Sequence, residues 1–151
     1  MLGELKEDEI QQLLKSNSIG RLGCTDGEHV YITPINYRLE DDSVLCYSLE
    51  GHKIDMMRKH PQVCFEVDHI NGPDHWRSVI ADGVYEEITD MAELNEIRPH
   101  YTEYMLRKKV SLTAMPKSEN MEEIPVKPLP EQVFYRIRLH KLSGRFETGI
   151  F

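Results

Sequence analysis

Short segments of alternating apolar and polar residues, separated by turn signals, recur along most of this chain. In the last of them Val133, Tyr135, Ile137 and Leu139 alternate with polar residues, which is typical of a strand with one buried face. Similar segments predict strands at residues 19–24, 29–39, 44–49, 63–67 and 76–88, with an Asp26-Gly27 hairpin turn between the first two. Antiparallel strands joined by hairpins favour a closed or nearly closed barrel over a parallel sheet.

Helical patterns are fewer than strand patterns. Helices are predicted at residues 7–16, at 53–60 and at about 90–110, where Pro99 predicts a break or a fresh start. Asn71-Gly72-Pro73 is predicted to be a loop. Met115 to Pro130 holds four of the eight prolines, so it is predicted to be irregular, and the sequence indicates no role for residues 111–131.

Composition limits the class of protein. A chain of 151 residues fits one domain over 1–151, and a net charge of −8 argues against broad binding to nucleic acid or anionic membranes. The start has no basic region followed by a long apolar stretch, so we expect a cytoplasmic protein without a signal peptide. The three cysteines, Cys24, Cys46 and Cys64, form no C-x-x-C pair and are expected to be small buried hydrophobes.

The segment around Gly51-His52-Lys53 lies between a predicted strand and a predicted helix. A helix start exposes unpaired N–H groups and the positive end of the helix dipole, which favour an anion. Gly51 lets the backbone approach closely, Lys53 supplies a charge and Ser48 a hydroxyl. On local sequence alone, a strand–helix corner with a surface lysine is the simpler interpretation.

Two further segments carry groups suited to a ligand. Pro34, within Thr33-Pro34-Ile35-Asn36, belongs at a sheet edge or bulge, where free backbone groups can meet a ring with donors and acceptors along its rim. In Trp76-Arg77-Ser78 the guanidinium and hydroxyl are phosphate donors and the indole offers a stacking face. An edge-protecting proline, an exposed arginine and a core tryptophan are the alternatives.

The order and spacing of three motifs resemble a known family. Gly-His-Lys-Ile-Asp at 51–55, Pro-Gln-Val-Cys-Phe-Glu-Val-Asp at 61–68 and Arg-Ser-Val-Ile-Ala-Asp-Gly-Val at 77–84 look like the pyridoxamine 5'-phosphate oxidase-related flavin proteins. The nearest branch is the Nim-type (5-nitroimidazole-resistance) proteins. The resemblance implies a mainly β fold with flanking helices, a six-stranded antiparallel split β-barrel known as the FMN-binding split barrel. It also implies a homodimer with FMN at the subunit interface.

Carried over by position, the resemblance assigns the phosphate of FMN to Lys53 and Ser48, with help from Ser78 and Arg77, some of it from the partner chain. The segment Thr33–Asn36 would run along the flavin ring, and His52 would lie near the cofactor. The complete set of expected flavin-binding residues is Thr33, Pro34, Ile35, Asn36, Tyr47, Ser48, Leu49, Gly51, His52, Lys53, Trp76, Arg77 and Ser78.

The hypothesis for function is an FMN-dependent oxidoreductase. Electrons would pass from a reduced nicotinamide or similar donor to a small acceptor, with a nitro compound as one candidate, and His52 or Tyr47 could act as an acid. The C-terminal segment from Ser143 does not match the arginine-bearing end of true pyridoxamine-phosphate oxidases, which argues against vitamin B6 synthesis. The alternatives are a non-catalytic flavin carrier or sensor, or a haem or deazaflavin binder on the same barrel.

Metal and nucleophile patterns are weak. The seven histidines show no H-x-x-x-H or paired Cys/His spacing, so no metal site is predicted, although His69 and His75 flank a loop and could meet in space. No G-x-S-x-G elbow is present, which disfavours a hydrolase.

Overall fold

The computed structural model describes residues 1–108 and 131–149 of the chain. Its elements are eight strands and three helices, in the order β1 (Leu2–Glu4), α1 (Glu7–Ser16), β2 (Ile19–Thr25), β3 (Val30–Asn36), β4 (Arg38–Leu39), β5 (Ser43–Leu49), α2 (His52–Lys59), β6 (Gln62–Gly72), β7 (His75–Glu87), α3 (Met91–Arg107) and β8 (Gln132–Glu147). No helix among these residues is both long enough and apolar enough to span a membrane.

All strands belong to one antiparallel sheet in the order β3-β2-β6-β7-β8-β5-β4, and β1 pairs with β8. Within the described ranges no ladder joins β3 to β4, so the barrel stays open and the predicted split-barrel class is confirmed. Eight strands are present where six were expected. Two short strands account for the difference. The three-residue β1 leaves almost no periodic signal in a sequence, and the predicted strand 29–39 is divided at Tyr37 into β3 and β4.

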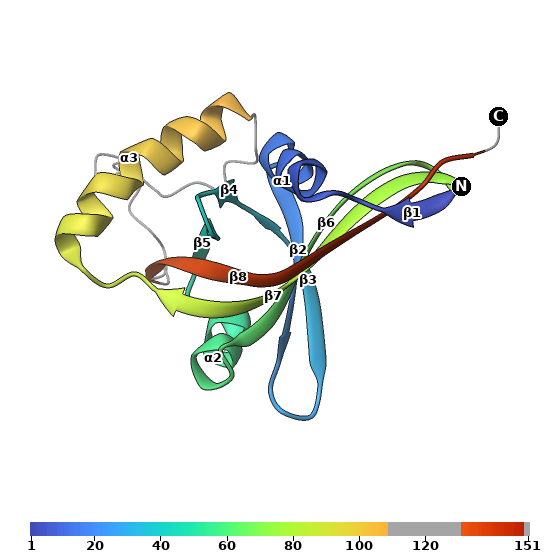
Figure 1. Cartoon of the computed structure of the whole chain (residues 1–151). Helices are drawn as coiled ribbons and strands as arrows, with labels where there is room; N and C mark the ends of the chain where they lie inside the picture. Colours follow the sequence, from blue (N-terminus) through green and yellow to red (C-terminus); the bar gives the residue numbers. More distant parts are fainter. Residues whose placement is uncertain (109–130, 150–151) are drawn as a thin grey trace.

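Two projections leave the barrel (Figure 1). One is the hairpin of β2 and β3, whose predicted turn is confirmed: Asp26 Oδ1 accepts the N–H groups of Glu28 and His29, and Gly27 has φ +99°. The other is formed by β1, the end of β6, the start of β7 and the end of β8. We call these two projections the hairpin and the arm.

Strand alternation sorts the side chains of the sheet onto two faces. Leu22, Phe65, Val79 and Ile137 point into the barrel and are buried with α1 and α2 in one core. Gly83 belongs to this inner face because a Cβ there would meet Ile137 Cγ2 at 2.4 Å. A second core lies outside the barrel, where α3 packs on β5 and β8 through the buried residues Leu45, Ile88, Tyr101, Met105 and Phe134.

Three expectations fail for identifiable reasons. The helix α3 runs through Pro99 without a break, because Ile97 and Tyr101 on either side pack on the same face of the sheet while Pro99 is exposed. Residues 71 and 72 extend β6 instead of forming a loop, since Gly72 pairs with His75. Cys64 is exposed because alternation places it on the face opposite Val63. The predicted irregular segment 115–130 lies outside the described residues.

Candidate functional site

The corner between β5 and α2 offers a place for an anion. Gly51 precedes the first helical residue and provides no side-chain cap for it. A Cβ at Gly51 would meet only the carbonyl oxygen of Leu49, at 4.0 Å, so the space over the helix start is open. The N–H groups of the first helical turn are therefore available to a negatively charged group approaching there.

Lys53 is half-buried, and its ammonium group lies near the thiols of Cys46 and Cys24, which belong to the barrel core. Burial lowers the pKa of Lys53, and the nearby thiols of Cys46 and Cys24 oppose that shift. Burial also raises the pKa of the Cys46 thiol to about 12, so this neighbour is neutral at physiological pH. Among the described residues no carboxylate forms an ion pair with Lys53. A half-buried cation without a counter-charge favours a bound anion.

Ser48 lies on the same face of β5 as Cys46, and therefore on the side of the strand to which Lys53 points. Its hydroxyl donates to the carbonyl oxygen of Leu49 at 2.9 Å. Rotation of the hydroxyl would release it for a ligand. Ser48, Gly51 and Lys53 thus lie at the same strand–helix corner, and their contact with a phosphate stays a prediction.

The strand β3 faces this corner across the mouth of the barrel. The rings of Tyr31 and His52 meet edge to face with centroids 6.1 Å apart. Thr33 and Ile35 follow Tyr31 on the same side of β3, and Ile35 is buried in the barrel core, whereas Pro34 and Asn36 lie on the opposite side. Pro34 lies on a strand at the edge of the sheet, as predicted.

Tyr31 was missed from the sequence, although its position two residues before Thr33 could have indicated it. Tyr47 and Leu49, which were expected at the site, lie on the other face of β5. The Tyr47 ring packs against Phe134 at 5.2 Å and near Tyr101 at 6.3 Å, beneath α3. Contact of Tyr47 or Leu49 with a ligand at the barrel mouth stays a prediction, and within one chain their side chains point away from Lys53.

The segment Trp76-Arg77-Ser78 lies elsewhere in the same chain. It is on β7, three strands away from β3 in the sheet, which corresponds to about 14 Å at ordinary strand spacing. Ser78 donates to Glu66 at 3.0 Å and Trp76 Nε1 donates to Glu147 at 3.0 Å, both on the face directed away from the barrel core. We call this face of the sheet the outer face.

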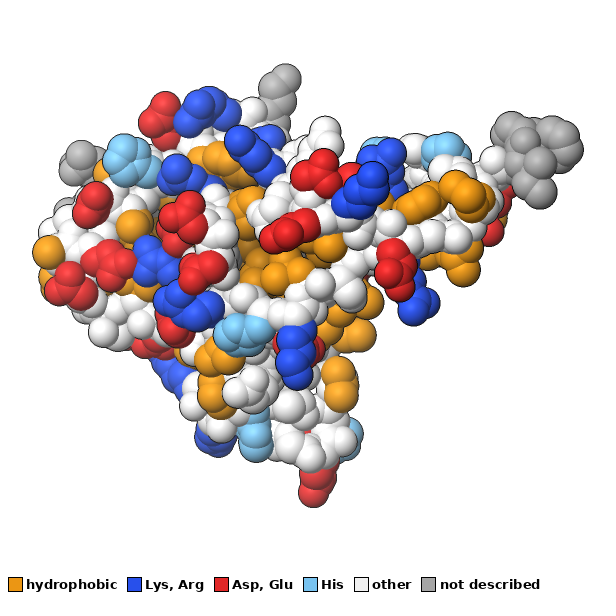
Figure 2. All heavy atoms as spheres, viewed as in Figure 1, with side chains coloured by type: hydrophobic (Ala, Val, Ile, Leu, Met, Phe, Trp, Pro, Cys, Tyr) orange, Lys and Arg blue, Asp and Glu red, His pale blue; other side chains and the backbone are white. Residues whose placement is uncertain are grey.

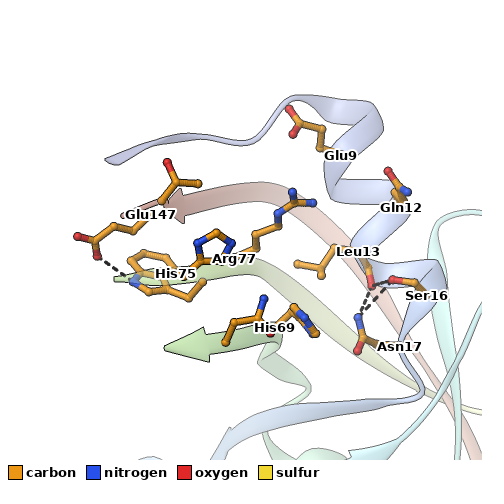
Figure 3. A pocket seen from close by; sticks show the side chains of 12 residues that line it. Glu9, Gln12, Leu13, Ser16, Asn17, His69, His75, Arg77 and Glu147 are labelled. Atoms are coloured by element: carbon orange, nitrogen blue, oxygen red, sulfur yellow. Dashed lines mark hydrogen bonds between the residues drawn. The ribbon is translucent and has the colours of Figure 1, made fainter. Parts of the chain in front are cut away.

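Arg77 points to the opposite face of β7 from Ser78, as alternation requires. It lines a cavity of about 520 Å³ between α1 and the arm, and Figure 3 shows its side chain extending toward α1. The other lining residues come from α1, β6, β7 and the end of β8: Glu9, Gln12, Leu13, Ser16, Asn17, His69, Asn71, His75, Trp76, Glu147 and Thr148. His69 and His75 both line this cavity. In the described part of the chain no group of three or more His, Cys, Asp or Glu side chains could hold a metal ion.

Comparison with known proteins identifies the relationship. The family model described as pyridoxamine 5'-phosphate oxidase matches residues 6–146. The chain belongs to the pyridoxamine 5'-phosphate oxidase family. The resemblance predicted from the three motifs is thus confirmed.

Individual relatives cover nearly the whole chain. An uncharacterized protein of Rhizobium meliloti (strain 1021) is 26% identical over 149 residues, covering 93% of this chain and 92% of the relative. A structure called a FAD-binding protein, from Mesorhizobium loti, is 28% identical with a TM-score of 0.79 and covers 98% of this chain and 99% of its own. A structure from Bacteroides thetaiotaomicron named for 5-nitroimidazole antibiotic resistance has a TM-score of 0.68 and covers 97% of this chain and 87% of its own. At 18% identity, the likeness to this last structure concerns the fold alone.

The buried position of Lys53 predicts a pH-dependent cost to stability. Because burial lowers its pKa below the ordinary value of 10.5, the unfolded chain binds more protons than the folded protein between the lowered pKa and 10.5. Stability should therefore rise with pH across that window. We expect Lys53→Met to raise the thermal midpoint of the ligand-free protein at pH 7, and this gain to shrink as the pH approaches 10.5.

The matched control is Lys59→Met, at the exposed end of the same helix, which should leave the midpoint nearly unchanged at both pH values. Thermal unfolding followed by circular dichroism measures both variants. A Lys53→Met variant less stable than the parent at pH 7 would show that the ammonium is paired and not strained.

Proposed function

We propose that this chain binds a flavin at the mouth of the barrel, with FMN as the first candidate, and acts as a flavin-dependent oxidoreductase. The observation that carries the proposal is the placement of Lys53. Its half-buried ammonium lacks a counter-charge within the described residues and lies beside an uncapped helix start with open space over Gly51. These groups suit a phosphate.

We assign the phosphate and the ring system of the flavin to different residues around this corner. Lys53, Ser48 and the first N–H groups of α2 would hold the phosphate, and Thr33 with its neighbours on β3 would lie beside the ring system. Tyr31 and His52, in edge-to-face contact, would cover the mouth between these two parts. The phosphate next to the ribityl chain is common to FMN and FAD. The FAD named for the Mesorhizobium loti relative therefore suits the same corner, and mass spectrometry of the extracted cofactor distinguishes the two.

A bound flavin supplies reversible two-electron chemistry, and the protein supplies position, electrostatics and access. The part of this chain would be to hold the phosphate at Lys53 and to place the ring system beside β3. His52 is exposed at that mouth and is the candidate to hold or release a proton near the ring. The donor we propose is a reduced nicotinamide and the acceptor a small molecule such as a nitro compound.

We propose further that the working form is a homodimer. Five large apolar side chains, Ile19, Val30, Ile32, Ile70 and Ile80, are between 48% and 75% exposed and share the outer face of β2, β3, β6 and β7. Figure 2 shows hydrophobic side chains along the hairpin, the arm and the angle between them. Apolar surface of this kind is typical of protein–protein contact. Trp76 and Ser78 lie on the same face, so a partner subunit could bring them to the flavin.

The phosphate contact predicts the effect of removing the ammonium. The purified protein should take up FMN with an oxidised-flavin spectrum, and Lys53→Ala should weaken FMN binding by about ten- to a hundredfold, the loss of one charge-assisted contact. Lys59→Ala is the control and should bind as the parent does. A Soret band would indicate haem instead, and protein that FMN cannot stain would contradict the proposal.

Catalytic turnover of the bound flavin distinguishes a flavin-dependent oxidoreductase from a non-catalytic flavin carrier. We expect NADH or NADPH to bleach the bound flavin in the absence of air, and a nitroaromatic compound or oxygen to restore its colour. Stopped-flow absorbance measures both half-reactions. Bound flavin that neither nicotinamide reduces within minutes would favour the carrier or sensor.

If the outer face is the contact between subunits, a charged side chain introduced there should weaken the dimer. Ile32→Glu would bury an unpaired carboxylate between subunits, at a cost of about 3 kcal/mol or roughly a hundredfold in dimer affinity. Leu106→Glu, at an exposed position on α3, is the control and should leave the dimer intact. Sedimentation over a concentration series measures both. A parent protein that is monomeric with FMN bound would contradict the proposed dimer.

A further inference from the structure

The cavity under α1 is separate from the barrel mouth within one chain. Its walls are α1 on one side and the inner faces of β6, β7 and β8 in the arm on the other. None of Ser48, Gly51, His52 or Lys53 lines it. Its volume of about 520 Å³ is within the range of small-molecule sites.

The hydrogen-bonding groups of the cavity fall into two sets. The carboxylate of Glu9 accepts from the N–H of Lys6 at 3.1 Å, and that of Glu147 accepts from Trp76 Nε1 at 3.0 Å. Within the described ranges Arg77 forms no ion pair and no hydrogen bond through its side chain, although it is the one arginine on these walls. The cavity therefore holds an uncommitted guanidinium beside carboxylates that already have partners.

We propose that this cavity binds a second ligand, a singly charged organic acid whose carboxylate pairs with Arg77. The planar guanidinium matches a carboxylate in two parallel hydrogen bonds. The buried Leu13 provides apolar surface for the body of the ligand, and the amides of Gln12 and Asn71 offer further donors. The carboxylate of Glu9 on the α1 wall repels a second negative charge, so a dianion such as a phosphate monoester is disfavoured.

This inference gives Arg77 a different ligand from the one that the sequence predicts. Arg77 and Ser78 are consecutive on β7 and point to opposite faces, so one phosphate cannot contact both side chains of the same chain. Ser78 lies on the outer face and would contact the flavin of a partner subunit. Arg77 would contact the ligand in the cavity of its own chain.

Nuclear magnetic resonance titration of the full chain, saturated with FMN, tests the inference. It uses three small phenyl compounds that differ in charge. Benzoate carries one negative charge, benzamide none and phenyl phosphate about two. We expect benzoate to shift amide resonances of α1 and of the arm, benzamide to shift them little, and phenyl phosphate to bind more weakly than benzoate.

Arg77→Gln should weaken benzoate binding tenfold or more, the loss expected for a charged hydrogen-bonded partner. Arg145→Gln is the matched control, because Arg145 pairs with Ser78 across the strands and so lies on the outer face of the same arm. It should leave benzoate binding unchanged. Both variants should keep the thermal midpoint of the parent, since both side chains are exposed.

The results also separate this inference from the proposed flavin site. Arg77→Gln should bind FMN as tightly as the parent, and Lys53→Ala should bind benzoate as tightly. Weaker FMN binding in Arg77→Gln would assign the arginine to the flavin and overturn the inference. Benzoate shifts absent from α1, or equal in parent and Arg77→Gln, would overturn it as well.

Discussion

The long strand β8 belongs to two parts of the molecule at once, and both sites depend on it. One edge pairs with β7 along nearly its whole length, while the other pairs with β5 over residues 132–138 and with β1 over 145–147. Between these stretches the register against β7 shifts, and Lys141 takes a φ of 46°. Such a bulge bends a strand. The half of β8 before it completes the barrel that surrounds Lys53, and the half after it forms the arm over which α1 leaves a cavity.

The barrel mouth keeps a half-buried cation whose charged form is disfavoured by burial. The buried thiols of Cys24 and Cys46 give Lys53 neutral neighbours, and no described carboxylate pairs with it. Elsewhere in the protein, two arginines do have carboxylate partners. Arg136 pairs with Glu40 and Glu93, and Arg58 pairs with Glu50 and Glu87. Lys53 and Arg77 have no such carboxylate partner in the described ranges. A cation without a carboxylate partner can pair with a ligand anion.

Local patterns in the sequence predict much of the fold and part of the site. The alternation of Val133 to Leu139, the Asp26-Gly27 turn and the edge position of Pro34 each follow from short-range chemistry and are confirmed. The continuity of α3 through Pro99 and the exposure of Cys64 depend on which sheet face each residue meets, which only the folded pairing decides. The cavity has the same origin. Its walls come from both ends of the chain, and no local signal connects Glu9 with Arg77 and Glu147.

Strand alternation finally explains how three consecutive residues on β7 can serve two ligands. Trp76 and Ser78 share the outer face with the exposed isoleucines, so they can reach a flavin only across the proposed subunit contact. Arg77, between them, faces α1 of its own chain. The proposed flavin site therefore draws on two subunits, whereas the cavity is formed within one.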